Sequence, residues 1–297
     1  MSQRSKDTLL ASAFTKTQHI KASAIIDPQY IKLPAALSFL VIGASRGIGA
    51  GIAYAYAKSG VANLTLAARG LSSKKLGAVD QIAREWASSM KTTVLEVDIT
   101  SPSSVAELAK CVRERYGKLD IVVFNSDYSG PVVLKVDDGD PQDFQDVFNV
   151  DFVGKYNRSG SVKTFIVVNS FAALITSGHI ANLAYCISKF AQARFFEFLS
   201  EQYSAEGVLA VAVHPGAVQT EMANKTTPES FRPYLTDDVR LCGAFCVWLS
   251  QEKRMWLNCR LLGAKWDIDE LLEKKHSIEE QDLLKFGYRI DTNLIIQ

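Results

Sequence analysis

Six short apolar segments alternate with longer segments of helical periodicity from residue 37 onward. The apolar segments are rich in β-branched side chains and apolar at almost every position, as expected of strands covered on both faces. They lie at residues 37–43, 62–68, 92–98, 119–125, 163–169 and 208–214. Helices are expected at residues 47–59, 74–89, 102–116, 141–157 and 180–205. This alternation predicts an α/β fold with a doubly wound parallel sheet and right-handed crossovers.

The chain length of 297 residues allows one large domain or two smaller ones. No repeat, coiled coil or low-complexity linker interrupts the alternation, so we expect a single domain at residues 37–297, which includes a C-terminal tail. Residues 1–36 are interpreted as an N-terminal extension with one short amphipathic helix.

Composition and charge give no sign of a nucleic-acid or membrane partner, because the net charge is only +1. No apolar run has the length of a signal-peptide core or a membrane span, so the cytoplasm is the expected location. The five cysteines are scattered, and Cys242 and Cys246 lack nearby His or Cys at a zinc-site spacing. We expect reduced thiols that pack as small apolar side chains, and no metal.

A glycine-rich loop, Gly-Ala-Ser-Arg-Gly-Ile-Gly, follows the first predicted strand and opens a helix. Gly43, Gly47 and Gly49 form a variant of the dinucleotide-binding fingerprint. Glycines here permit a tight turn and a close approach to a pyrophosphate, while the helix N-terminus faces its negative charge. The pattern alone is compatible with a plain turn, but its place between strand and helix favours cofactor binding.

The residues after the second predicted strand indicate which nicotinamide cofactor is bound. A carboxylate there would favour NAD, because it would bind the free ribose 2′-hydroxyl. The strand instead ends in Arg69, and the glycine loop contributes Arg46. Two cations and no carboxylate favour the 2′-phosphate of NADP. The alternative for Arg69 is a solvated surface arginine.

Tyr185 and Lys189 are four residues apart and therefore share one face of a predicted helix. The spacing alone is not diagnostic, since Tyr54 and Lys58 repeat it on the helix after the glycine loop, where a structural role is expected. Ser170, in contrast, ends the fifth strand, at the edge where such sheets bind ligands.

These three side chains suit proton transfer to a carbonyl. A lysine ammonium near Tyr185 favours its phenolate and lowers its pKa from about 10. Tyr185 would then donate a proton to a carbonyl oxygen, and Ser170 would hydrogen-bond the same oxygen. The alternative is a half-buried tyrosine beside a solvated lysine.

Residues 37–266 resemble a single-domain, NADP-dependent member of the short-chain dehydrogenase/reductase family, which has a Rossmann fold. The motifs that carry the resemblance are GASRGIG (43–49), VDIT (97–100), FNS (124–126), VVNSFAA (167–173), YCISK (185–189) and HPGAVQTEM (214–222). The last motif and the segment LLGAKWDIDEL resemble fungal members of secondary-metabolite pathways.

The resemblance implies that Asp98 contacts adenine, Asn125 supports the central sheet, and Pro215 and Gly216 lie against the nicotinamide. Thr220 would reach the carboxamide or a phosphate. The full implied cofactor-binding set is Gly43, Ser45, Arg46, Gly47, Ile48, Gly49, Arg69, Asp98, Asn125, Tyr185, Lys189, Pro215, Gly216, Val218 and Thr220.

Three features depart from the family pattern. Asp127 stands where the family has a glycine beside the cofactor, and Asp151 stands where it has an asparagine that assists proton relay to the lysine. A carboxylate at position 151 is placed to pair with Lys189 and alter the surroundings of Tyr185. The helix that continues past Gly154 is short, which would weaken a homo-oligomer.

The expected function is reduction of a ketone or aldehyde, or oxidation of an alcohol, on a small lipophilic metabolite with NADP(H). Residues 171–184 and 221–240 would bound the substrate, with Phe231 and Tyr234 in a lid. The alternative is a degraded member that retains the fold, and perhaps NADP binding, with little or no catalysis.

Overall fold

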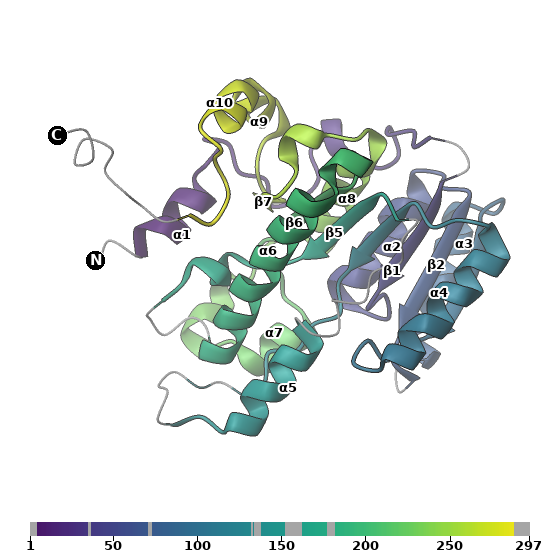
Figure 1. Ribbon diagram of the computed structural model, residues 1–297, viewed down its shortest axis with the longest axis horizontal. Helices are drawn as coiled ribbons and strands as arrows, with labels where there is room; N and C mark the ends of the chain where they lie inside the picture. Colours follow the sequence, from purple (N-terminus) through teal and green to yellow (C-terminus); the bar gives the residue numbers. More distant parts are fainter. Residues whose placement is uncertain are drawn as a thin grey trace.

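Seven parallel strands form one sheet in the order β3-β2-β1-β4-β5-β6-β7 in the computed structural model (Figure 1). The structure describes residues 5–34, 37–70, 73–131, 133, 138–151, 162–176 and 182–287. The strands are β1 (Ser38–Ile42), β2 (Asn63–Ala68), β3 (Lys91–Glu96), β4 (Ile121–Phe124), β5 (Thr164–Val168), β6 (Leu209–His214) and β7 (Leu261–Gly263). The six predicted strands and the doubly wound parallel fold are confirmed. Strand β7 was not predicted, because three residues are too few for a recognisable pattern.

Helices cover both faces of the sheet (Figure 1). On one face α2 (Gly47–Lys58) packs against α3 (Ser73–Trp86) and α8 (Leu241–Gln251), and on the other α5 (Pro141–Asp151) packs against α6 (Leu183–Tyr203). Helix α4 (Pro102–Tyr116) lies on the α6 side in Figure 1. The predicted continuation of α5, with Gly154 and the shortening after it, lies outside the described residues, as does the predicted start of α6 at residues 180–181.

Helix α8 was absent from the predicted elements. Its residues 241–250 are all buried, so it shows no polar face and no amphipathic period. A Cβ added to Gly243 would lie 2.6 Å from the carbonyl oxygen of Gly51, so α8 and α2 touch through their backbones. A Cβ added to Gly51 would lie 2.5 Å from the carbonyl oxygen of Val239, just before α8, so both positions require glycine.

Residues before β1 pack on the C-terminal part of the chain. They contain α1 (Ser5–Ser12) and η1 (Ala24–Ile26), and they bury Ile26 and Ile31 in the main core. Their C-terminal neighbours include α9 (Ile268–Glu273), followed by α10 (Lys275–Glu280). The remaining short elements are η5 (Phe171–Leu174), η6 (Ser204–Glu206), α7 (Glu221–Thr226), η7 (Glu229–Tyr234) and η8 (Met255–Leu257).

Two further expectations concern the cysteines and the Tyr54 and Lys58 pair. All five cysteines carry free thiols, and four of them are buried. Lys58 stacks over the ring of Trp86, with its Nζ 4.1 Å from the ring centroid. Lys58 and Tyr54 border neither of the cavities described below.

Among the described residues, no helix is long and apolar enough to cross a membrane.

Candidate active site

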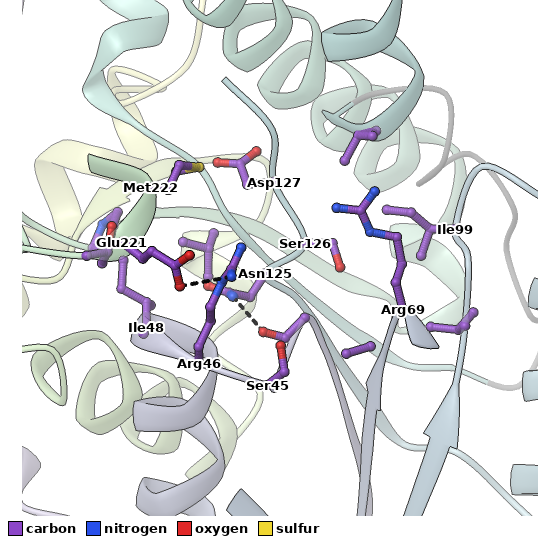
Figure 2. A pocket seen from close by; sticks show the side chains of 18 of the residues that line it. Ser45, Arg46, Ile48, Arg69, Ile99, Asn125, Ser126, Asp127, Glu221 and Met222 are labelled. Carbon is purple, nitrogen blue, oxygen red and sulfur yellow. Dashed lines mark hydrogen bonds and ion pairs between the residues drawn. The ribbon is translucent and has the colours of Figure 1, made fainter. Parts of the chain in front are cut away.

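A first cavity lies where the strand order reverses, at the carboxyl ends of β1 and β4 (Figure 2). In open α/β sheets this switch point is the usual place for a ligand. The cavity measures about 220 Å³. Of the predicted cofactor-binding residues, it is bordered by Gly43, Ser45, Arg46, Gly47, Ile48, Arg69, Asp98, Asn125, Tyr185, Pro215 and Thr220.

The glycine loop adopts a backbone that requires its glycines. Gly43 and Gly47 have φ angles of +83° and +54°, in the region that side chains disfavour. Gly49 does not border the cavity but lies beneath it, where an added Cβ would meet the carbonyl oxygen of Gly43 at 2.1 Å. Asn125 holds the loop by donating from Nδ2 to that carbonyl over 3.1 Å. The result is a cradle of exposed backbone at the N-terminus of α2, suited to a pyrophosphate.

Asp98 and Arg69 are two charged side chains that border the first cavity. Asp98 accepts hydrogen bonds from the backbone N and the Oγ1 of Thr100, at 2.9 and 2.7 Å. These bonds lower the pKa of the Asp98 carboxyl and keep it ionised. Arg69, at the end of β2, has no carboxylate within ion-pair distance among the described residues.

Arg46 has a different environment. Its Nη1 lies 3.0 Å from Oε2 of Glu221, a carboxylate that also pairs with Lys75 and Lys225. Figure 2 shows Arg46 turned toward Glu221, while Arg69 lies on the other side of Asn125. The sequence analysis did not foresee the contact between Arg46 and Glu221, because 175 residues separate them.

A second cavity, of about 520 Å³, adjoins the first. It is bordered by Ser170, Gly216 and Val218, and Tyr185 borders both cavities. Ser170 caps η5 and accepts a hydrogen bond from the backbone N of Ala172. A group bound in either cavity would therefore meet the Tyr185 side chain.

Lys189 lies behind Tyr185 and borders neither cavity. Its Nζ is 5.3 Å from the centroid of the Tyr185 ring and forms an ion pair with Asp127, and its side chain is fully buried. Asp127, which stands where the family pattern has a glycine, thus places its carboxylate against the Lys189 ammonium. The expectation had been that Asp151 would form this pair.

Asp151 has other hydrogen-bond partners. Its carboxylate accepts from Ser188 Oγ at 2.8 Å and from the backbone N of Tyr128 at 2.9 Å, and its backbone carbonyl accepts from Gln192 Nε2 at 2.7 Å. Gln192 in turn accepts from Asn169 Nδ2 at 2.7 Å. The sequence analysis missed Asn169, Gln192 and Ser188. The i+3 and i+7 spacing of Ser188 and Gln192 from Tyr185 would have indicated a shared helix face.

The pKa of the Tyr185 phenol is raised. Burial is the main cause, and the Asp127 and Asp151 carboxylates add to it, while Lys189 and Ser170 lower it. Lys189 therefore lowers the pKa of Tyr185, as predicted, but burial and the two carboxylates raise it by more. Lys189 itself has a raised pKa, because the carboxylates of Asp127 and Asp151 outweigh its burial. At neutral pH the site holds a phenol beside an ammonium, an arrangement suited to proton donation.

The short chain dehydrogenase family model matches residues 38–230, which contain the glycine loop and the Ser170, Tyr185 and Lys189 cluster. This chain belongs to the short-chain dehydrogenase/reductase family. A short chain dehydrogenase of Aspergillus terreus, pgmD, is 34% identical over 291 residues and covers 92% of this chain and 93% of its own. The mpl6 short chain dehydrogenase of Monascus purpureus is 35% identical, covering 82% of this chain and 86% of its own.

Solved short-chain dehydrogenases share the fold at low identity. A 7α-hydroxysteroid dehydrogenase, solved with NADH and 7-oxo glycochenodeoxycholic acid, is 18% identical with a TM-score of 0.69, covering 82% of this chain and 97% of its own. A Burkholderia cenocepacia dehydrogenase, solved with NADP, is 20% identical with a TM-score of 0.65, covering 77% of this chain and 96% of its own. At such low identity these similarities establish the fold alone. One neighbour holds NADH and the other NADP, so they do not indicate which cofactor this chain binds.

The half-buried His214 ends β6 and borders the second cavity. Its ring stacks on Phe171 at 4.2 Å, and its Nδ1 accepts from the backbone N of Phe171 at 3.3 Å. Burial, and to a lesser degree the charge of Lys265, lower the pKa of His214 to about 3. The imidazole is therefore neutral in the folded protein.

This lowered pKa predicts a pH-dependent stability. Between about pH 6.5 and pH 3 the unfolded chain binds a proton at His214 that the folded protein does not, so stability falls as the pH falls. His214→Gln keeps an acceptor without a titrating proton, and should flatten this slope by up to about 1.4 kcal/mol per pH unit. Urea unfolding at a series of acidic pH values measures the slope, and equal slopes in both proteins would contradict the prediction.

Proposed function

We propose that this protein is an NADPH-dependent reductase of ketones or aldehydes, with alcohol oxidation as its reverse reaction. The position of Tyr185 between the two cavities carries the proposal, because one cavity suits a dinucleotide and the other a lipophilic carbonyl compound. The first cavity fits the cofactor because its loop offers bare backbone, in a tight turn that a Cβ on Gly49 would disrupt by meeting the Gly43 carbonyl oxygen at 2.1 Å.

The chain's residues supply proton transfer and orientation. The cofactor, when bound, supplies a hydride for the carbonyl carbon. Tyr185 donates its phenolic proton to the carbonyl oxygen, and Ser170 hydrogen-bonds the same oxygen. The Lys189 ammonium then stabilises the phenolate that remains on Tyr185. A raised pKa keeps Tyr185 protonated at neutral pH and favours reduction, so alcohol oxidation should increase as the pH rises.

Arg69 supports a preference for NADP over NAD. It extends from the end of β2 without an ion-pair partner among the described residues, whereas Arg46 is held by Glu221. An arginine in this position binds a 2′-phosphate through charge-assisted hydrogen bonds. Arg46 would join it by leaving Glu221 for the phosphate.

Arg69→Ala should raise the Kd for NADPH about 10- to 100-fold, because hydrogen bonds to charged groups contribute about 1.5–3 kcal/mol. The Kd for NADH should change far less, since NADH has no 2′-phosphate. Fluorescence titration with both cofactors measures the two constants, and Arg84→Ala on the outer face of α3 serves as the control. Equal losses for NADPH and NADH would contradict a phosphate-binding role.

The substrate is proposed to be a small lipophilic metabolite of a fungal secondary-metabolite pathway. The extensive matches to short chain dehydrogenases of Aspergillus and Monascus support this, together with the similarity of the HPGAVQTEM motif. Apolar side chains form a large part of the lining of the second cavity, among them Met222, Phe231 and Leu235. Phe231 lies in η7, in the segment proposed as a lid.

The Asp127–Lys189 ion pair favours a second candidate, a degraded dehydrogenase with weak or no catalysis. The carboxylate raises the pKa of Tyr185 and lies beside the cavity that would hold an anionic cofactor. NADPH titration followed by NADPH-consumption assays on a panel of ketones separates the two candidates. Absence of binding would refute the cofactor assignment. Binding without turnover, with turnover gained in Asp127→Gly, would favour the degraded form.

A further inference from the structure

The second cavity has a wall that comes from the N-terminal segment of the chain. Thr8, Leu9 and Ser12 of α1 border it, together with Gln18, and so do Tyr185 and Ser170. Residues 5–18 thus reach the same cavity as the catalytic cluster, although more than 150 residues separate them in sequence.

One face of α1 is turned to this cavity. Thr8 and Ser12 are four residues apart and share a face, and Ser12 Oγ donates to the Thr8 carbonyl over 2.8 Å. The Ser12 hydroxyl is therefore engaged by the helix itself, and Leu9 supplies the apolar surface. Leu10 is the next residue, is similarly exposed (66% against 56% for Leu9), and does not border the cavity.

Contacts with the segment after β7 hold α1 in place. Trp266 Nε1 donates to the Ala11 carbonyl at 2.9 Å, and the rings of Phe14 and Trp266 are 4.9 Å apart. The backbone N atoms of Lys16 and Thr17 donate to the Glu270 carboxylate at 2.6 and 3.0 Å. These bonds involve only the protein, so the wall exists before any substrate arrives.

We propose that α1 is a specificity wall of the active site, with Leu9 in contact with the apolar body of the substrate. The preferred substrates are then ketones or aldehydes whose apolar body extends from the carbonyl at Tyr185 as far as α1. A cavity of about 520 Å³ accommodates a compound of more than one ring. This inference rests on the proposed carbonyl reduction for its kinetic test, but not for the binding test below.

A matched pair of variants tests the wall by kinetics. Leu9→Trp fills the cavity, so kcat/KM for para-phenylacetophenone divided by that for acetophenone should fall about tenfold, the discrimination expected of a changed apolar contact. Leu10→Trp makes the same replacement one residue away and should keep the wild-type ratio. A ratio that changes equally in both variants, or in neither, would overturn the inference.

A binding test is independent of turnover. Leu9→Cys and Leu10→Cys each place a thiol on α1, in a protein in which four of the five native cysteines are buried. Bound para-phenylacetophenone, with NADP⁺ present, should slow iodoacetamide alkylation at position 9 several-fold and leave position 10 unchanged, as measured by peptide mass spectrometry. Equal slowing at the two positions, or no slowing at position 9, would overturn the wall. Protection at position 9 in a protein without turnover would support the wall and refute the proposed catalysis.

Discussion

Tyr185→Phe should lower kcat for ketone reduction by about 10²–10⁴-fold, the usual contribution of a positioned general acid. The Tyr185 side chain borders both cavities and has a phenolic proton to donate. Within the described part of the chain, it is the only such side chain that also lies beside a lysine ammonium. Phenylalanine keeps the ring and its packing, so the loss should appear in turnover, with a much smaller change in NADPH affinity. Single-turnover rates under saturating NADPH measure this effect directly.

Tyr54→Phe is the matched control, because Tyr54 and Lys58 have the same spacing on α2 and border neither cavity. It should leave kcat within twofold of the wild-type value. A Tyr185→Phe protein that retained wild-type turnover would show that another group donates the proton, and the mechanism proposed above would be wrong.

Strand and helix positions followed from the sequence because buried parallel strands are continuously apolar and the intervening helices are amphipathic. The glycine loop was also predictable from the sequence, because its tight turn has positive φ angles that favour glycine. Elements without such a pattern were missed, namely the uniformly apolar α8 and the three-residue β7.

The candidate active-site cluster was predictable in its members but not in its electrostatics. The sequence identified Tyr185 and Lys189, yet which carboxylate pairs with the lysine depends on how two loops and a helix meet in space. Asp127 takes that place, while Asp151 accepts hydrogen bonds from Ser188 and Tyr128. The contribution of α1 to the second cavity was also not predictable, because a helix that docks onto a distant part of the chain leaves no local signal.

Lys189 is expected to have a structural role as well as a catalytic one, because its buried ammonium is the ion-pair partner of Asp127. Lys189→Met leaves that carboxylate without its cation, and removing one partner of a buried pair lowers stability by about 3–5 kcal/mol. Lys189→Met/Asp127→Asn removes the remaining charge and should recover much of this loss. Lys58→Met, which removes only a stacking contact with Trp86, should cost no more than about 1 kcal/mol.

The turnover of these variants separates the two roles of Lys189. Turnover should remain about 10²-fold or more below wild type in both variants, because neither has a cation to stabilise the Tyr185 phenolate. Recovery of turnover together with stability in the double variant would mean that Lys189 acts on the fold alone.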